Sequence, residues 1–165
     1  MTQSTLAGGT GLEQAMRRLS TLDGVQITVG VQEPDGSGRK KVRDGPPSDD
    51  TLADVAYRNE YGIGVPARPW LRTALREYRT RWTRLAKPVP VAFRKRGEAA
   101  AELRLLAVAM VGDTKTTLLD YPWRENAKST IAAKGSDQPL VDTGQLVQSQ
   151  RAMVTVPGRA PEIIG

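Results

Sequence analysis

Residues 25–31 read VQITVGV, and this stretch carries the clearest strand pattern in the chain. Hydrophobic residues at positions 25, 27, 29 and 31 alternate with Gln26, Thr28 and Gly30. Successive side chains of a strand point to opposite faces, so a period of two places the hydrophobic residues together on one face. The pattern therefore predicts a half-buried strand, and Asp23-Gly24 before it is typical of a turn.

Two long helices are predicted in the middle of the chain, over about residues 70–87 and 98–119. In both segments apolar residues recur every three or four positions, which is the spacing of one helix face. Pro69 is expected at the first position of the earlier helix, and Pro88 and Pro90 are expected to end it after Lys87. The two apolar faces should meet at a buried seam formed by Trp70, Leu75, Tyr78, Trp82, Leu103, Leu106 and Met110.

The order of these elements predicts an α+β fold. The most economical partner for the strand at 25–31 is a C-terminal strand at about 151–156, which gives a small antiparallel sheet. The two long helices are expected to pack on one face of this sheet. Shorter helices are expected at about residues 12–22, 51–61 and 145–150, and Ile163-Ile164 reads as a weak tail.

The length of 165 residues suits a single domain over 1–165, with a flexible N-terminus at 1–10. Residues 32–50 contain three prolines and three glycines, and this predicts a long exposed loop. The loop has too few apolar residues to fold back into a core, so we expect either a solvated tip or an arm that contacts a partner. Its basic residues are the candidate contacts: Arg39, Lys40, Lys41 and Arg43.

Composition narrows the classes of activity, because the chain has no cysteine and no histidine. Disulfides, thiolate nucleophiles, Ser-His-Asp triads and most transition-metal sites are thereby excluded. No apolar run approaches the roughly 18 residues that a membrane span needs. The acidic pairs, none of which lies in a catalytic motif, are Asp49-Asp50, Glu98/Glu102 and Asp113/Asp120. We expect a protein that is not an enzyme and has no cofactor, no metal and no membrane partner.

Positive charge is concentrated in residues 67–96, which hold ten Lys or Arg and a single acid, Glu77. Arginine forms forked contacts with phosphate and is also enriched at protein interfaces. Three interpretations stay open: contact with nucleic acid, an interface with an acidic neighbouring subunit, and a solvated helix face. The candidate interface or DNA-facing residues in this segment are Arg72, Arg76, Arg79, Arg94, Lys95 and Arg96.

Two further segments are too specific for ordinary loops. Residues 59–71 read NEYGIGVPARPWL, and residues 134–146 read KGSDQPLVDTGQL, with Ser149 shortly after. The pair resembles the tailed-bacteriophage neck and tail-completion proteins, also described as minor tail components or virion morphogenesis proteins. Their pattern runs N-E-[FY]-G, I-P-A-R-P-[FW]-L, a helix pair and K-G-x-x-x-P-L-[VI]-D-T-G-x-L-x-x-S before a final strand. Val65 departs from the usual Ile and Trp70 from the usual Phe, and the resemblance covers about residues 25–156.

The resemblance implies a structural virion protein of the head–tail junction, assembled in the cytoplasm of the bacterial host. It implies a homo-oligomeric ring that joins the head connector to the tail tube, with genomic DNA passing through the lumen. Six copies are expected, with a twelvefold collar as the alternative. The implied partners are neighbouring neck, head-closure and tail-terminator or tail-tube proteins. A tail terminator, a connector ring protein or a free, sequence-nonspecific nucleic-acid-binding protein are the competing assignments.

Physical reasoning gives the motif residues structural roles. Pro66 and Pro69 should stiffen the entry to the long helix, and Arg68 between them should pair with Glu60 or Asp142. Asp142 and Thr143 are expected to cap the turn that opens at Gly144. The family-motif structural residues are Glu60, Gly62, Pro66, Arg68, Pro69, Trp70, Leu140, Asp142, Thr143 and Gly144.

Overall fold

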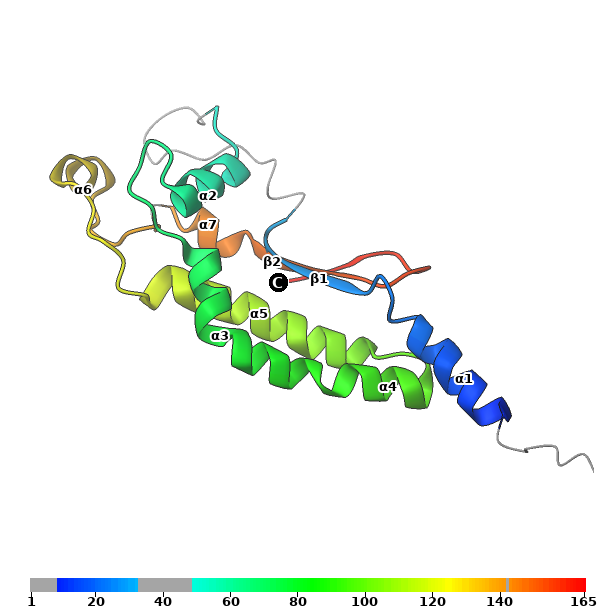
Figure 1. Ribbon diagram of the computed structural model, residues 1–165. Helices are drawn as coiled ribbons and strands as arrows, with labels where there is room; N and C mark the ends of the chain where they lie inside the picture. The colour runs from blue at the N-terminus through cyan, green and yellow to red at the C-terminus, as the bar shows by residue number, and fades with distance from the viewer. Residues whose placement is uncertain (1–8, 33–48, 142) are drawn as a thin grey trace, which may run out of the picture.

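The computed structural model describes residues 9–32, 49–141 and 143–165. The predictions for residues 1–8, for the basic loop residues Arg39, Lys40, Lys41 and Arg43, and for Asp142 lie outside the described residues. Figure 1 shows the elements in order: α1 Gly9–Ser20, β1 Gln26–Val31, α2 Leu52–Tyr61, α3 Trp70–Ala86, α4 Pro88–Arg96, α5 Ala100–Asp120, α6 Lys128–Lys134, α7 Gln145–Gln148, β2 Gln150–Thr155 and β3 Glu162–Ile164.

The three strands form one antiparallel sheet in the order β1-β2-β3. β1 pairs with β2 from Gln26 opposite Thr155 to Val31 opposite Gln150, which confirms the predicted pairing of chain-distant strands. The predicted tail at Ile163-Ile164 is part of β3, with Ile163 opposite Met153 of β2. The fold is α+β, as the sequence predicts.

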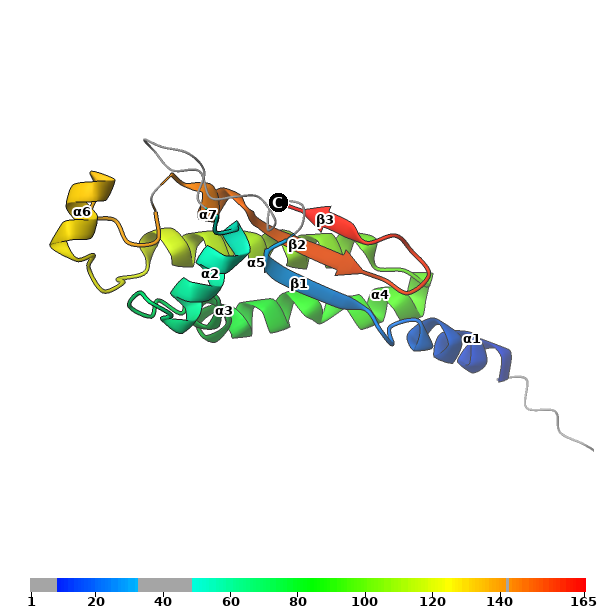
Figure 2. The same cartoon turned by 90° about the horizontal axis from the view of Figure 1, so that it is seen from above.

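The sheet lies over α5, and α3 runs alongside α5 (Figure 2). Val154 of β2 and Val111 of α5 belong to one buried cluster between the sheet and this helix. A second cluster joins the two helices through Ala74, Trp82 and Leu106. The predicted helices at 70–87 and 98–119 are confirmed to within two residues at each end.

Two expectations for α3 are wrong. Leu75 is 53% exposed and not at the seam, because its neighbour Ala74 already faces α5 and one helical step turns Leu75 outward. Pro69 is the residue before the helix, which begins at Trp70. Trp70 and Trp82 are buried as predicted.

The prolines after Lys87 do not simply end a helix but also begin another. Pro88 is the first residue of α4, and Pro90 is in its first turn. Backbone N–H groups in a first helical turn have no partner within the helix, so proline loses nothing there. Val89, Ala92 and Phe93 of α4 are buried against α5 and the sheet, and Gly97 ends α4 with a left-handed φ of 78°.

Candidate functional site

The first motif begins where α2 ends. Gly62 terminates α2 with φ 76°, and its backbone N–H donates to the carbonyl of Arg58 at 2.7 Å. A Cβ at Gly62 would lie 2.8 Å from that of Ala67, so the loop after the helix folds directly over this glycine. The position therefore requires glycine for two reasons, a positive φ and a close approach.

Glu60 caps α3 from the last turn of α2. Its carboxylate accepts hydrogen bonds from the backbone N–H of Leu71 at 2.9 Å and from that of Arg72 at 3.2 Å. The Arg72 side chain completes the arrangement, because its Nε donates to Oε1 of Glu60 at 2.9 Å. A negative charge at a helix N-terminus is favourable. The buried carboxylate thus fixes the angle between α2 and α3, since Pro69 supplies no side-chain cap.

Arg68 is buried and binds the connection after α5. Its guanidinium donates to the carbonyl of Arg124 at 3.0 and 3.2 Å, to the carbonyl of Glu125 at 3.3 Å and to Oδ1 of Asn126 at 3.0 Å. Burial, and secondarily the charge of Arg124, lower the pKa of Arg68. The predicted pairing with Glu60 is wrong, because Glu60 is taken by α3 and Arg72.

The second motif meets the first in a buried apolar cluster. Trp70 from the first motif packs there with Leu146 from α7, and Leu140 is partly buried against them. Leu140 has φ 61° and Gly144 has φ 75°, so two residues before α7 adopt the left-handed backbone conformation. The expected capping by Thr143 is wrong: Gly144 itself is the N-cap, and among the described residues the Thr143 side chain accepts no hydrogen bond from a backbone N–H.

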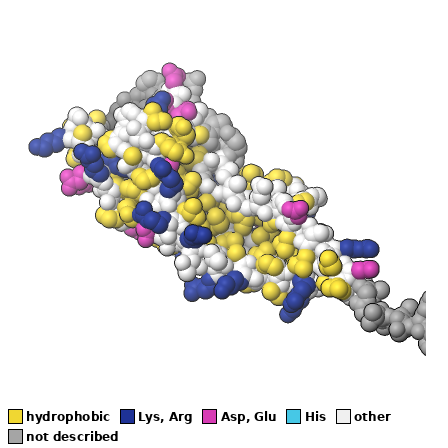
Figure 3. Space-filling model, viewed as in Figure 1, with side chains coloured by type: hydrophobic (Ala, Val, Ile, Leu, Met, Phe, Trp, Pro, Cys, Tyr) yellow, Lys and Arg dark blue, Asp and Glu magenta, His cyan; other side chains and the backbone are white. Residues whose placement is uncertain are grey.

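The predicted basic residues separate into bound and free groups. Arg72 is held by Glu60, Arg76 contacts Glu77 at 3.1 Å and Tyr121 Oη at 3.2 Å, and Arg96 contacts Glu102 at 2.7 Å. Within the described part of the chain, the side chains of Arg79, Arg94 and Lys95 have no such partner, and all three are exposed. Figure 3 shows Lys and Arg side chains along the lower border of the face, over α3 and α4, with exposed apolar side chains above them.

The acidic pairs do not form shared sites. Asp113 is buried and accepts from Arg81 and from Trp82, whereas Asp120 is exposed. Glu98 faces Arg159 at 3.5 Å, and Glu102 faces Arg96. The described residues contain no group of three or more acidic side chains that could hold a metal ion.

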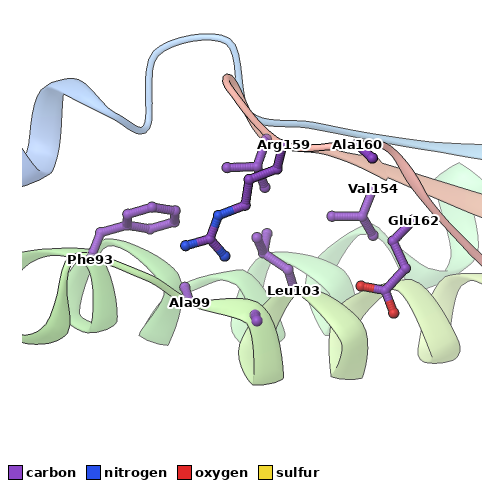
Figure 4. A pocket seen from close by; sticks show the side chains of 9 residues that line it. Phe93, Ala99, Leu103, Val154, Arg159, Ala160 and Glu162 are labelled. Atoms are coloured by element: carbon purple, nitrogen blue, oxygen red, sulfur yellow. The ribbon is translucent and has the colours of Figure 1, made fainter.

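A small cavity lies between α4, the start of α5 and the β2–β3 hairpin (Figure 4). Its volume is about 60 Å³, and Phe93, Leu103 and Val154 form its apolar wall. The Arg159 side chain extends from the hairpin toward the space between Phe93 and Leu103 (Figure 4). Its guanidinium pairs with Glu98 at 3.5 Å. This volume suits a few water molecules at most.

Exposed apolar residues on the outer side of α5 are the feature that sequence reasoning missed. Leu105, Val108 and Leu119 are 59%, 56% and 41% exposed. The signal was present, because α5 is apolar on its outer side as well as on its buried one, and a helix of that kind is normally covered on both sides. A second exposed group lies at the first motif, with Tyr57 and Tyr61 of α2 in ring contact at 4.7 Å.

The chain matches no family model, no curated protein and no solved structure. None of the helices in the described ranges is long and apolar enough to span a membrane.

Proposed function

We propose that this chain is a structural subunit of a bacteriophage head–tail junction, forming a ring that joins the head connector to the tail tube. The proposal begins from the motif resemblance. Among the described residues of the two motifs, two charged side chains are buried, those of Glu60 and Arg68. The observation that carries the proposal is that both of them bind backbone groups. A motif used in this way fixes the geometry of a subunit.

Such a subunit needs surfaces for its neighbours, and the exposed apolar residues of α5 supply one. Exposed apolar patches on soluble chains mark interaction sites. A closed ring uses two different surfaces of each subunit, arranged head to tail. The exposed aromatic pair Tyr57 and Tyr61, with Arg72 lying 4.9 Å over the Tyr61 ring, has the composition of a further contact surface, separate from that of α5.

Native mass spectrometry of the purified chain tests the proposal. We expect a closed oligomer of six subunits, with twelve as the alternative, and no turnover of any substrate. Electron microscopy of the protein added to tailless heads and to isolated tails then separates a neck role from a tail-terminator or connector role. A chain that stays monomeric at its highest soluble concentration, and does not bind heads or tails, contradicts the proposal.

A nucleic-acid-binding role is the second candidate. It is supported by three exposed basic side chains, two on α3 and one directly after its last residue. Arg79, Arg84 and Lys87 have no acidic partner among the described residues. If all three contact phosphates, the logarithm of the duplex affinity should fall with the logarithm of salt concentration with a slope of about −2.7. In the triple variant R79Q/R84Q/K87Q the salt dependence of the duplex affinity should then disappear. If the wild-type chain instead stays oligomeric at high salt and does not bind duplex DNA, the ring is favoured.

A further inference from the structure

The outer face of α5 is an apolar stripe. Its members are spaced by four, three, four and seven residues, which keeps them on one side of the helix, opposite the buried residues Leu103 and Thr117. Lys115, three residues after Gly112 and four before Leu119, falls on the same face and is the one charged residue within the stripe. Neither Lys115 nor Asp120, which follows Leu119, has a partner among the described residues. The members of this stripe are Ala101, Leu105, Val108, Gly112 and Leu119.

The N-terminal helix α1 presents a second apolar face. Leu12, Met16 and Leu19 share one side of the helix, and they are 65%, 63% and 37% exposed. α1 extends beyond the end of the sheet and lies beside α4 (Figures 1 and 2). Arg18 fixes it there, because its Nη1 donates to the carbonyls of Lys95 at 2.8 Å and Arg94 at 3.4 Å at the end of α4.

The chain therefore holds α1 in place through a polar contact and leaves its apolar side uncovered. A helix of 12 residues is marginally stable in water unless an apolar face is buried. The uncovered faces of α1 and α5 are both narrow and helical; that of α1 is apolar, and that of α5 is apolar apart from Lys115. Their sizes match the packing of one helix against another.

We propose that α1 of one copy docks on the outer stripe of α5 in the neighbouring copy. This inference rests on the proposed ring, since it names the segments that meet between subunits. Two different faces then meet, so the contact is head to tail and can repeat around a ring. A pairing of α5 with α5 would instead give a two-fold dimer.

Charge complementarity also favours α1 as the occupant. Beside its apolar face α1 carries Glu13 and Arg17, four residues apart on one flank, and neither has a side-chain partner among the described residues. The α5 stripe itself holds one cation, Lys115. Docking with the two helices antiparallel can therefore bring Glu13 against Lys115, which favours this pairing over other arrangements.

Cysteine cross-linking tests this docking directly, because the natural chain contains no cysteine. Two single variants, M16C and V108C, are prepared with tags of different size, mixed and oxidised. We expect a disulfide between differently tagged chains, since docking brings the two positions close enough for a bond. The double variant M16C/V108C should give a ladder that ends at the full oligomer. The matched control Q14C, on the opposite face of α1, should give no cross-link with V108C.

A second measurement uses charge in place of cross-linking. M16D and V108D each place a carboxylate on an exposed position, so the monomer should keep its thermal stability. Each should weaken self-association by about tenfold or more, equivalent to about 1.4 kcal/mol, and combining the two should add little once the contact is lost. Q14D serves as the control and should leave assembly unchanged.

The outcomes separate the docking from the ring itself. An intact oligomer with no bond between M16C and V108C overturns the docking and leaves the ring standing, and a bond between two copies of V108C would identify α5 as its own partner. A wild-type chain that native mass spectrometry shows to be monomeric overturns both.

Discussion

The indole Nε1 of Trp82 donates a hydrogen bond to Oδ2 of Asp113 at 2.7 Å, joining α3 to α5 inside their seam. The other carboxylate oxygen of Asp113 accepts from Arg81, whose side chain is half exposed. The carboxylate is buried, and both of its oxygens have donors. This arrangement lets a large aromatic side chain fill the seam without leaving its N–H unsatisfied.

The variant D113N should lower the free energy of unfolding by about 1.5–3 kcal/mol, because a neutral amide replaces the acceptor of two hydrogen bonds and turns a donor toward one of them. Urea unfolding measures the change. D120N, at the exposed end of the same helix, is the control and should stay within about 0.5 kcal/mol of the wild type. Equal effects of the two variants would show that the Trp82 contact contributes nothing specific.

R68K should destabilise the chain by about 1.5–3 kcal/mol, since an ammonium cannot reproduce the forked contact with the carbonyls of Arg124 and Glu125. The connection after α5 should become easier to cut by protease. R79K, at an exposed position of α3, is the control. Unchanged cleavage after residue 121 in R68K would contradict the role given to Arg68.

E60Q should lower the free energy of unfolding by about 1–2 kcal/mol, because the amide nitrogen of glutamine cannot accept from the first N–H groups of α3 and the charge at the helix start is lost. E77Q removes a half-exposed carboxylate from the same helix and should have little effect. Thermal unfolding followed by circular dichroism compares the two variants. A larger loss in E77Q than in E60Q would refute the capping role.

G62A and G64A isolate the effect of close packing at the first motif. Both glycines have a positive φ, 76° and 71°, so each alanine should cost about 1–2 kcal/mol from backbone strain. Only G62A also places a Cβ 2.8 Å from that of Ala67, whereas the space at Gly64 is open. Urea unfolding should therefore show a clearly larger loss for G62A, and equal losses would exclude the close approach.

Stability should fall in acid through two carboxylates, that of the exposed Asp54 and that of the half-buried Glu102. Hydrogen bonds from Thr51 hold the pKa of Asp54 below its ordinary value of 3.8, and a hydrogen bond from Arg96 holds the pKa of Glu102 below 4.5. A lowered folded-state pKa stabilises the fold above the ordinary value, and this contribution is lost as the pH falls through the folded-state pKa. The double variant D54N/E102Q should lose less stability than the wild type as the pH drops from 5 to 3. Parallel pH profiles would contradict this.

The sequence correctly predicted those elements in which the spacing of apolar residues alone indicates which side chains are buried. The alternation in β1, the apolar spacing of α3 and α5, and the glycine after α2 each depend on residues close together in the chain. The predicted pairing of β1 with β2 also holds, because each strand has one apolar face that only a shared core can bury. The two motifs meet through apolar packing of Trp70 and Leu140, and not through the predicted pairing of Arg68 with Glu60.

Period and turn chemistry were enough to predict β1, β2, the long helices α3 and α5 and the α+β class. Tertiary packing, by contrast, decided which partner each polar group takes: Glu60 binds the start of α3, and Arg68 binds a connection more than fifty residues away. It also decided that α4 forms at Pro88 and that the outer face of α5 stays uncovered. These outcomes depend on how elements distant in sequence approach one another, because burial and hydrogen-bond geometry exist only once the elements are packed.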